Sequence, residues 1–279
     1  MSENNNSPVR IDDLYPNLSS LVQQCNRSHK LEELARRAQP KENVFFGLDD
    51  CCNEVLNGVK RVPPPRCDSY SYLATIDEFV KGLGDDVLKR KKLWNKIKDA
   101  KSFLNTVVEA AWAIHFWNSG LSPLIEEPLD PSHQEVKDAD IVVVFESRKY
   151  WLDAVNVEFQ LPSICSSTMR EDLPEKLVGA ARKKYKDKFG QAMSSGALSG
   201  SSVGVLLSVL KREAEVKPFS WQIESSLPTK LFEDTPGLDV VLIHTLRSEK
   251  NSDVLKPCLL MKNLVPDNSH NTKFVQSIS

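Results

Sequence analysis

The chain has 279 residues, 41% of them hydrophobic, which is enough for one large domain or two smaller ones with a sizeable core. Its 36 Lys and Arg side chains almost balance its 38 Asp and Glu side chains, so the net charge of -2 excludes a global attraction to nucleic acid. No signal peptide, no run of roughly 18 apolar residues and no paired cysteines are visible, so we expect a cytoplasmic or nuclear protein without a membrane partner.

The first hundred residues are predicted to be mainly helical. Residues 1–12 are polar and are predicted to be disordered, whereas apolar residues recur at helical spacing between residues 13 and 101. The helical segments expected in this region are Leu14–Cys25, His29–Ala38, Asp49–Val59, Tyr72–Leu83 and Asp85–Ala100. They carry no chemical motif, and we expect residues 13–101 to form a helical region before a core domain of residues 102–265 and a flexible tail of residues 266–279.

The next predicted helix, Ser102–Gly120, contains a single acidic residue among apolar neighbours. Apolar residues recur here every three or four positions, and Gly120 is placed to end the helix in a left-handed conformation. Glu109 lies in the middle of this helix and is the only carboxylate between Asp99 and Glu126. Such a lone acid either faces water or belongs to a functional site.

A β-hairpin that carries two aspartates is predicted to follow. The two expected strands are Ile141–Phe145 and Tyr150–Phe159. A turn centred on Ser147 and Arg148 would place Asp140 opposite Val155, with Asp153 close by on the same face of the sheet. Crowded carboxylates repel each other, and a cation, a shared proton or a basic partner usually keeps them together. The hairpin therefore suggests a divalent-metal site.

A basic helix, Pro174–Phe189, is predicted after the hairpin. Lys184 and Lys188 flank its apolar stripe on one edge, and Arg182 flanks it on the other. Basic side chains on a helix neutralise phosphates without reading the base sequence. We therefore expect Arg182, Lys183 and Lys188 to contact nucleic acid.

Three further strands complete the predicted fold. They follow a Gly- and Ser-rich loop at Gln191–Ser202. The expected strands are Val203–Leu210, Leu238–Leu246 and Leu255–Met261. Together with the preceding strands, they predict an α/β fold with a mixed central sheet of about five or six strands, flanked by helices.

The order of these features resembles the core of the PD-(D/E)XK nuclease superfamily. The chain has a helix with an embedded Glu, a Gly-containing turn, a strand, and then a hairpin that carries Asp140 and Asp153. The resemblance covers residues 102–263 and depends more on the order of elements than on single letters. It implies that Glu109, Asp140 and Asp153 bind Mg²⁺ or Mn²⁺ and that the protein hydrolyses phosphodiester bonds in nucleic acid.

One departure from the family pattern leaves three alternatives open. The superfamily has a Lys two residues after the third-strand acid, where this chain has Val155, which cannot orient a water molecule or offset charge on a phosphate. In the first alternative, Lys184 of the basic helix has taken over this role. In the second, the motif has shifted to Glu158, with Gln160 in the place of the lysine. In the third, the chain is a catalytically inactive module that binds nucleic acid or protein.

Overall fold

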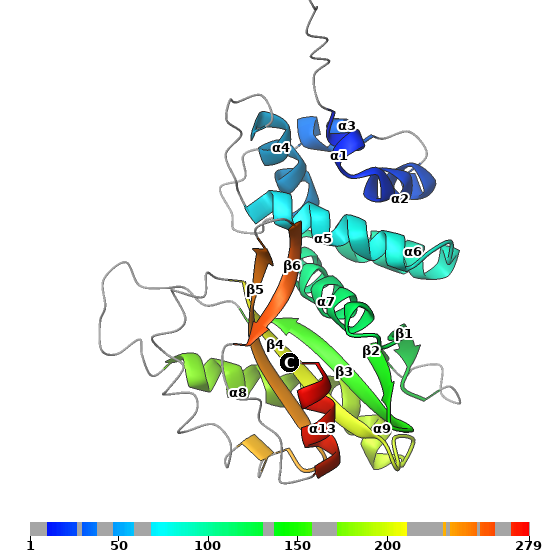
Figure 1. Ribbon diagram of the computed structural model, residues 1–279, viewed down its shortest axis with the longest axis vertical. Helices are drawn as coiled ribbons and strands as arrows, with labels where there is room; N and C mark the ends of the chain where they lie inside the picture. Colours follow the sequence, from blue (N-terminus) through cyan, green and yellow to red (C-terminus); the bar gives the residue numbers. More distant parts are fainter. Residues whose placement is uncertain are drawn as a thin grey trace, which may run out of the picture. The chain divides into compact units, whose positions relative to one another are not determined.

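The computed structural model of the protein (Figure 1) describes residues 10–26, 30–37, 47–58, 68–130, 137–157, 172–210, 231–232, 235–249, 252–259 and 269–278. The chain divides into two compact units. The first unit comprises Met1–Ala110 and Ser248–Leu255. The second unit comprises Ala111–Arg247 and Lys256–Ser279.

The described part of the first unit is mainly helical, as predicted. Its helices are α1 (Ile11–Leu14), α2 (Pro16–Asn26), α3 (Leu31–Arg37), α4 (Leu48–Gly58), α5 (Asp68–Gly82), α6 (Val87–Ile97) and the first part of α7 (Ala100–Asn118). The Asp77 carboxylate of α5 accepts hydrogen bonds from the Leu18 backbone amide at 2.8 Å and from the Asn17 side chain at 2.9 Å. Because the first N–H groups of a helix have no partner within it, this contact caps α2 and ties it to α5.

A six-stranded mixed sheet lies largely in the second unit (Figure 1). Its strands are β1 (Leu124–Pro128), β2 (Asp138–Phe145), β3 (Arg148–Asn156), β4 (Ser202–Val209), β5 (Val240–Glu249) and β6 (Ser252–Leu259). They follow chain order across the sheet; β1, β2 and β3 pair antiparallel, whereas β3, β4 and β5 pair parallel. The predicted α/β fold, with a mixed sheet and a helical N-terminal region, is therefore confirmed.

One face of the sheet packs against aromatic side chains from two distant helices. In the second unit, Trp112 of α7 donates a hydrogen bond to Ser208 Oγ of β4 at 3.0 Å. From α13 (Ser269–Ser277), Phe274 stacks on Tyr150 of β3 with 3.9 Å between the ring centroids. All four side chains are buried, so this face forms a packed aromatic core.

Helix α8 (Asp172–Lys184) covers the other face. It continues into one turn of π-helix, Tyr185–Phe189, and then into α9 (Gly190–Ser194). Trp151 and Val155 of β3 belong to the core cluster that α8 and the π-helical turn complete. The apolar stripe that packs into this cluster consists of Leu177, Ala181, Tyr185 and Phe189.

The turn between β2 and β3 lies one residue earlier than predicted. It is formed by Glu146 and Ser147, whose φ angles of 44° and 66° are left-handed. Two-residue turns of this kind match the twist of antiparallel strands, although they usually carry glycine or asparagine. The observed register, continued by one residue, places Asp140 opposite Asp153, whereas the predicted turn placed it opposite Val155.

Two other segments differ from the sequence-based expectations. Helix α9 occupies the start of the predicted Gly- and Ser-rich loop, because Ala192 is buried in the core under it. Helix α13 lies within the predicted flexible tail, because Phe274 anchors it to the sheet.

Residues 1–9 of the predicted disordered segment lie outside the described residues. Among the helices that the structure describes, none is both long and apolar enough to cross a membrane.

A candidate site of two aspartates and two lysines

The strand acids Asp140 and Asp153 lie together in the second unit. Strands β2 and β3 hold them opposite each other, on the face of the sheet that α8 covers. The two residues are 3% and 0% exposed. Carboxylates without water around them need nearby positive charge, because burial strongly disfavours an isolated ion.

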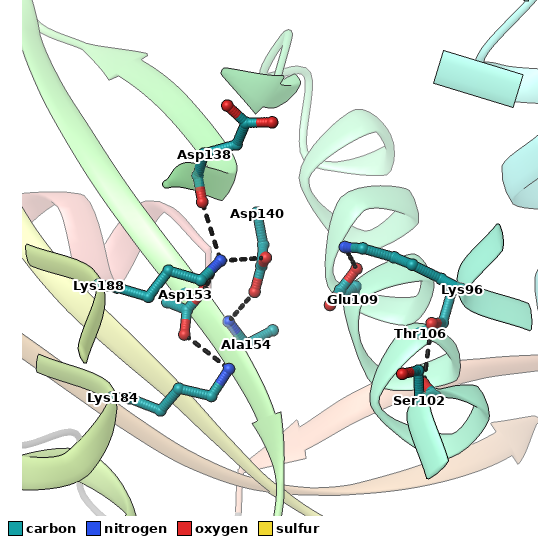
Figure 2. Close-up of polar contacts among 10 residues, drawn as sticks. All are labelled: Lys96, Ser102, Thr106, Glu109, Asp138, Asp140, Asp153, Ala154, Lys184 and Lys188. Carbon is teal, nitrogen blue, oxygen red and sulfur yellow. Dashed lines mark hydrogen bonds and ion pairs between the residues drawn. The ribbon is translucent and has the colours of Figure 1, made fainter. Parts of the chain in front are cut away.

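Two lysines of the next helix supply this charge (Figure 2). Lys184 Nζ lies 2.9 Å from Asp153 Oδ2. Lys188 Nζ lies 2.8 Å from Asp153 Oδ1 and 2.9 Å from Asp140 Oδ1. The same ammonium donates a hydrogen bond to the backbone carbonyl oxygen of Asp138 at 2.8 Å. The four charged side chains therefore form one network, which we call the Asp–Lys cluster.

The position of both lysines follows from their spacing in the helix. Residues four apart lie on the same side of a helix, so Lys184 and Lys188 share one edge of the apolar stripe. Tyr185 and Phe189 anchor that edge in the core. One of the three alternatives placed Lys184 beside the acids, and Lys188 was expected to contact nucleic acid. In the structure, the Lys188 ammonium contacts both carboxylates, and its contact with nucleic acid stays a prediction.

Val155 is an apolar neighbour of the Asp–Lys cluster. It shares the face of β3 that carries Asp153, and it packs against the core cluster under α8. A lysine at this position would have to carry its charge out of that cluster. The amine of Lys184 reaches Asp153 from the facing helix without this cost.

The electrostatics of the Asp–Lys cluster are dominated by burial. Burial, followed by the neighbouring charge of Asp140, raises the pKa of Asp153 to about 7, although both lysines oppose this shift. Burial alone would lower the pKa of Lys188, but the carboxylates of Asp140 and Asp153 outweigh it and raise that pKa above its ordinary value. Asp153 thus binds a proton near neutral pH more strongly than an exposed aspartate does.

The two carboxylates differ in their hydrogen bonds. Asp140 Oδ2 accepts a hydrogen bond from the backbone N–H of Ala154 at 3.0 Å. Neither oxygen of Asp153 has an aligned hydrogen-bond donor among the described residues, although two ammonium groups lie at ion-pair distance. The two ammonium groups therefore balance the charge of Asp153, but its oxygens accept no aligned hydrogen bond from the described residues. This is unusual for a fully buried carboxylate.

The helix acid Glu109 belongs to the first unit. Within that unit its carboxylate forms an ion pair with Lys96 of α6, with 2.8 Å between Nζ and Oε2. Lys96 was not among the residues that the sequence singled out. Both aspartates belong to the second unit, so whether Glu109 joins their site stays a prediction.

The remaining predicted residues are not tested by this geometry. Glu158 and Gln160, the alternative pair, lie outside the described residues. Arg182 is half-buried and Lys183 is exposed on α8. Their contact with nucleic acid stays a prediction.

Comparisons with known proteins add no relative. No protein-family model, no curated protein and no solved structure matches the chain.

Proposed function

We propose that the protein is a metal-dependent nuclease that hydrolyses phosphodiester bonds in nucleic acid. The Asp–Lys cluster carries the proposal: two buried aspartates on neighbouring strands, with two lysines of the next helix 2.8 to 2.9 Å from them. The helix, three antiparallel strands, second helix and parallel strand around this cluster agree with the resemblance to the PD-(D/E)XK superfamily.

The donor groups of the cluster suit a hard divalent cation. The oxygens of Asp140 and Asp153, with the carbonyl oxygen of Asp138, are of the kind that Mg²⁺ and Mn²⁺ prefer. We assign Asp140 and Asp153 as the residues of the second unit that would hold the cation. A divalent cation, when bound, supplies Lewis-acid stabilisation and lowers the pKa of a bound water.

Lys184 is the candidate for the charge that Val155 cannot provide. Its amine is held by the Asp153 carboxylate, and its side chain is 27% exposed, so it borders both the buried acids and solvent. A positive group in this position stabilises negative charge that builds on a phosphate during hydrolysis. The basic side chains of Arg182 and Lys183 on the same helix would contact the phosphate backbone of a bound strand.

A cleavage assay tests the proposal. The purified protein is incubated with plasmid, linear and single-stranded DNA and with RNA, in Mg²⁺, in Mn²⁺ and in EDTA. We expect cleavage only with metal, and Asp140→Asn and Asp153→Asn should each reduce it by about a hundredfold or more. Lys186→Gln, which removes an exposed charge from the same helical turn, should leave cleavage unchanged. Cleavage that survives both aspartate substitutions would contradict the assigned site.

A second candidate function is a nuclease-fold module that binds nucleic acid without cutting it. Val155 in the lysine position favours this alternative, because the substitution removes a charge that the superfamily uses in catalysis. This alternative predicts no cleavage with any metal. It also predicts that a gel-shift assay detects binding, and that Arg182→Gln and Lys183→Gln weaken that binding.

A further inference from the structure

We propose that Lys188 is a tethered cation that occupies the metal position of the Asp–Lys cluster, so that a divalent cation enters only when the Lys188 ammonium withdraws. This inference concerns regulation of the proposed site and rests on the assignment of Asp140 and Asp153 as metal ligands. It does not require that the protein cuts nucleic acid.

The number of oxygens around the Lys188 ammonium is the main argument. Asp140 Oδ1, Asp153 Oδ1 and the Asp138 carbonyl oxygen lie 2.9, 2.8 and 2.8 Å from Nζ, and three separate chain positions supply them (Figure 2). The ammonium donates hydrogen bonds to Asp140 Oδ1 and to the Asp138 carbonyl oxygen, and Asp153 Oδ1 lies at ion-pair distance from it. Two carboxylates and one backbone carbonyl are also a usual partial ligand set of a hard divalent cation.

Asp153 gives an independent indication that a stronger cation fits there. It is fully buried, and neither of its oxygens has an aligned hydrogen-bond donor among the described residues. A buried carboxylate oxygen normally has such a donor or a metal ion. The ammonium of Lys188 therefore offsets the charge of Asp153 while leaving its hydrogen-bonding capacity unused.

The Lys188 side chain has a route out of the cluster. It is 19% exposed, and it extends from the π-helical turn Tyr185–Phe189. Its flexible four-carbon stem lets the amine move to solvent while the backbone stays in place. Lys184 would remain paired with Asp153 Oδ2 when Lys188 leaves. When Lys188 leaves and a divalent cation enters, the cluster thus loses one positive charge and gains two.

Mn²⁺ affinity of a lysine variant tests the inference. Mn²⁺ binding is measured from the electron paramagnetic resonance signal of free Mn²⁺, for the full chain and for Lys188→Gln. Loss of the competing charge should tighten Mn²⁺ binding by about tenfold or more. Lys186→Gln removes an exposed charge two residues away and should leave the affinity unchanged. Equal or weaker Mn²⁺ binding by Lys188→Gln overturns the inference.

A second measurement uses the unaltered protein, because Lys188→Gln can fail to fold. Lysine amines are acetylated under native conditions, and the extent of modification at each lysine is read by mass spectrometry. Lys188 should be protected in EDTA and become at least about threefold more reactive in saturating Mn²⁺, as its amine moves to solvent. Lys186 should react equally in both conditions. Protection of Lys188 that persists in saturating Mn²⁺ overturns the inference, as does the absence of Mn²⁺ binding.

These readouts separate the inference from the proposed function. Tighter Mn²⁺ binding by Lys188→Gln, in a protein that cuts no nucleic acid, would support the tethered cation and contradict the nuclease. Metal-dependent cleavage with Lys188 protected throughout would support the nuclease and contradict the tethered cation.

Discussion

Lys188 compensates two buried carboxylates at once, because its ammonium lies within 2.9 Å of both Asp140 and Asp153. Removal of one partner from a buried ion pair typically costs about 3 to 5 kcal/mol, since the other charge stays buried. We expect Lys188→Gln to lower the free energy of unfolding by about 3 kcal/mol in metal-free buffer. Urea denaturation measures this change.

The control for this prediction is again Lys186→Gln, which should change the free energy of unfolding by less than about 0.5 kcal/mol. Adding Asp140→Asn to Lys188→Gln should restore part of the lost stability, because one of the uncompensated charges is then removed. Equal losses for Lys188→Gln and Lys186→Gln would show that Lys188 does not stabilise the acids.

The buried imidazole of His244 in β5 should make the stability of the protein depend on pH. Burial, followed by the nearby His115, lowers the pKa of His244 from 6.5 to about 3. Its ring meets the edge of Trp112, with 4.7 Å between the centroids. The unfolded chain therefore binds a proton that the folded chain excludes. Stability from His244 is fully present above about pH 6.5 and is lost as pH falls toward 3, by at most about 1.4 kcal/mol per pH unit.

Urea denaturation from about pH 7 to about pH 5 measures this loss. His244→Leu keeps an apolar side chain in the core and removes the titrating group, so its stability should fall less steeply over the same range. His115, whose pKa burial also lowers, contributes a loss of the same sign that remains in the variant. Identical pH slopes for the two proteins would exclude His244 as a source of acid sensitivity.

Among the elements, β4 leaves no room for a side chain at Gly204, which lies between Leu152 of β3 and Val240 of β5. A Cβ atom there would lie 2.7 Å from Leu152 Cδ2 and 3.1 Å from the backbone oxygen of Val240. Gly204→Ala should therefore lower the free energy of unfolding by about 1 to 3 kcal/mol. Gly179→Ala is the matched change in α8, where nothing lies within 4 Å of the added atom, and it should raise stability by up to about 1 kcal/mol. Urea denaturation of both variants measures whether the two changes in the free energy of unfolding have opposite signs.

The elements themselves were predictable to different degrees. Helix α7 and the stripe of α8 follow from apolar periodicity, because burial of one face sets the period. The hairpin turn at Glu146 and Ser147 was placed one residue late, because neither residue is a glycine and nothing local marks left-handed positions. The π-helical turn, Tyr185–Phe189, also has no signal in the sequence.

At the scale of the whole chain, the α/β fold with its mixed sheet could be predicted, whereas the partners of charged groups could not. Asp140 and Asp153 were expected to be neighbours because a short hairpin limits their separation. Lys188 lies 48 residues beyond Asp140, and its contact with the two carboxylates depends on how α8 and the π-helical turn pack on the sheet. Such contacts between distant segments arise from packing and leave little local trace.

Helix α13 packs against the sheet although most of its residues are polar. Its Phe274 is fully buried and stacks on Tyr150, with Phe116 and Phe145 close to it. Loss of a buried phenylalanine leaves a cavity and removes aromatic contacts. We expect Phe274→Ala to lower the free energy of unfolding by about 3 to 5 kcal/mol, measured by urea denaturation.

Two further variants show whether packing or polar contacts hold α13 in place. Tyr150→Phe keeps the ring stack but removes the hydroxyl that donates to Asn271 Oδ1 at 3.2 Å, and it should cost about 1 kcal/mol. Lys273→Ala changes an exposed neighbour of Phe274 and should cost less than about 0.5 kcal/mol. If Phe274→Ala cost no more than Lys273→Ala, the terminal helix would not be part of the cooperative fold, since a docked helix cannot lose its buried ring without exposing the apolar surface of the sheet.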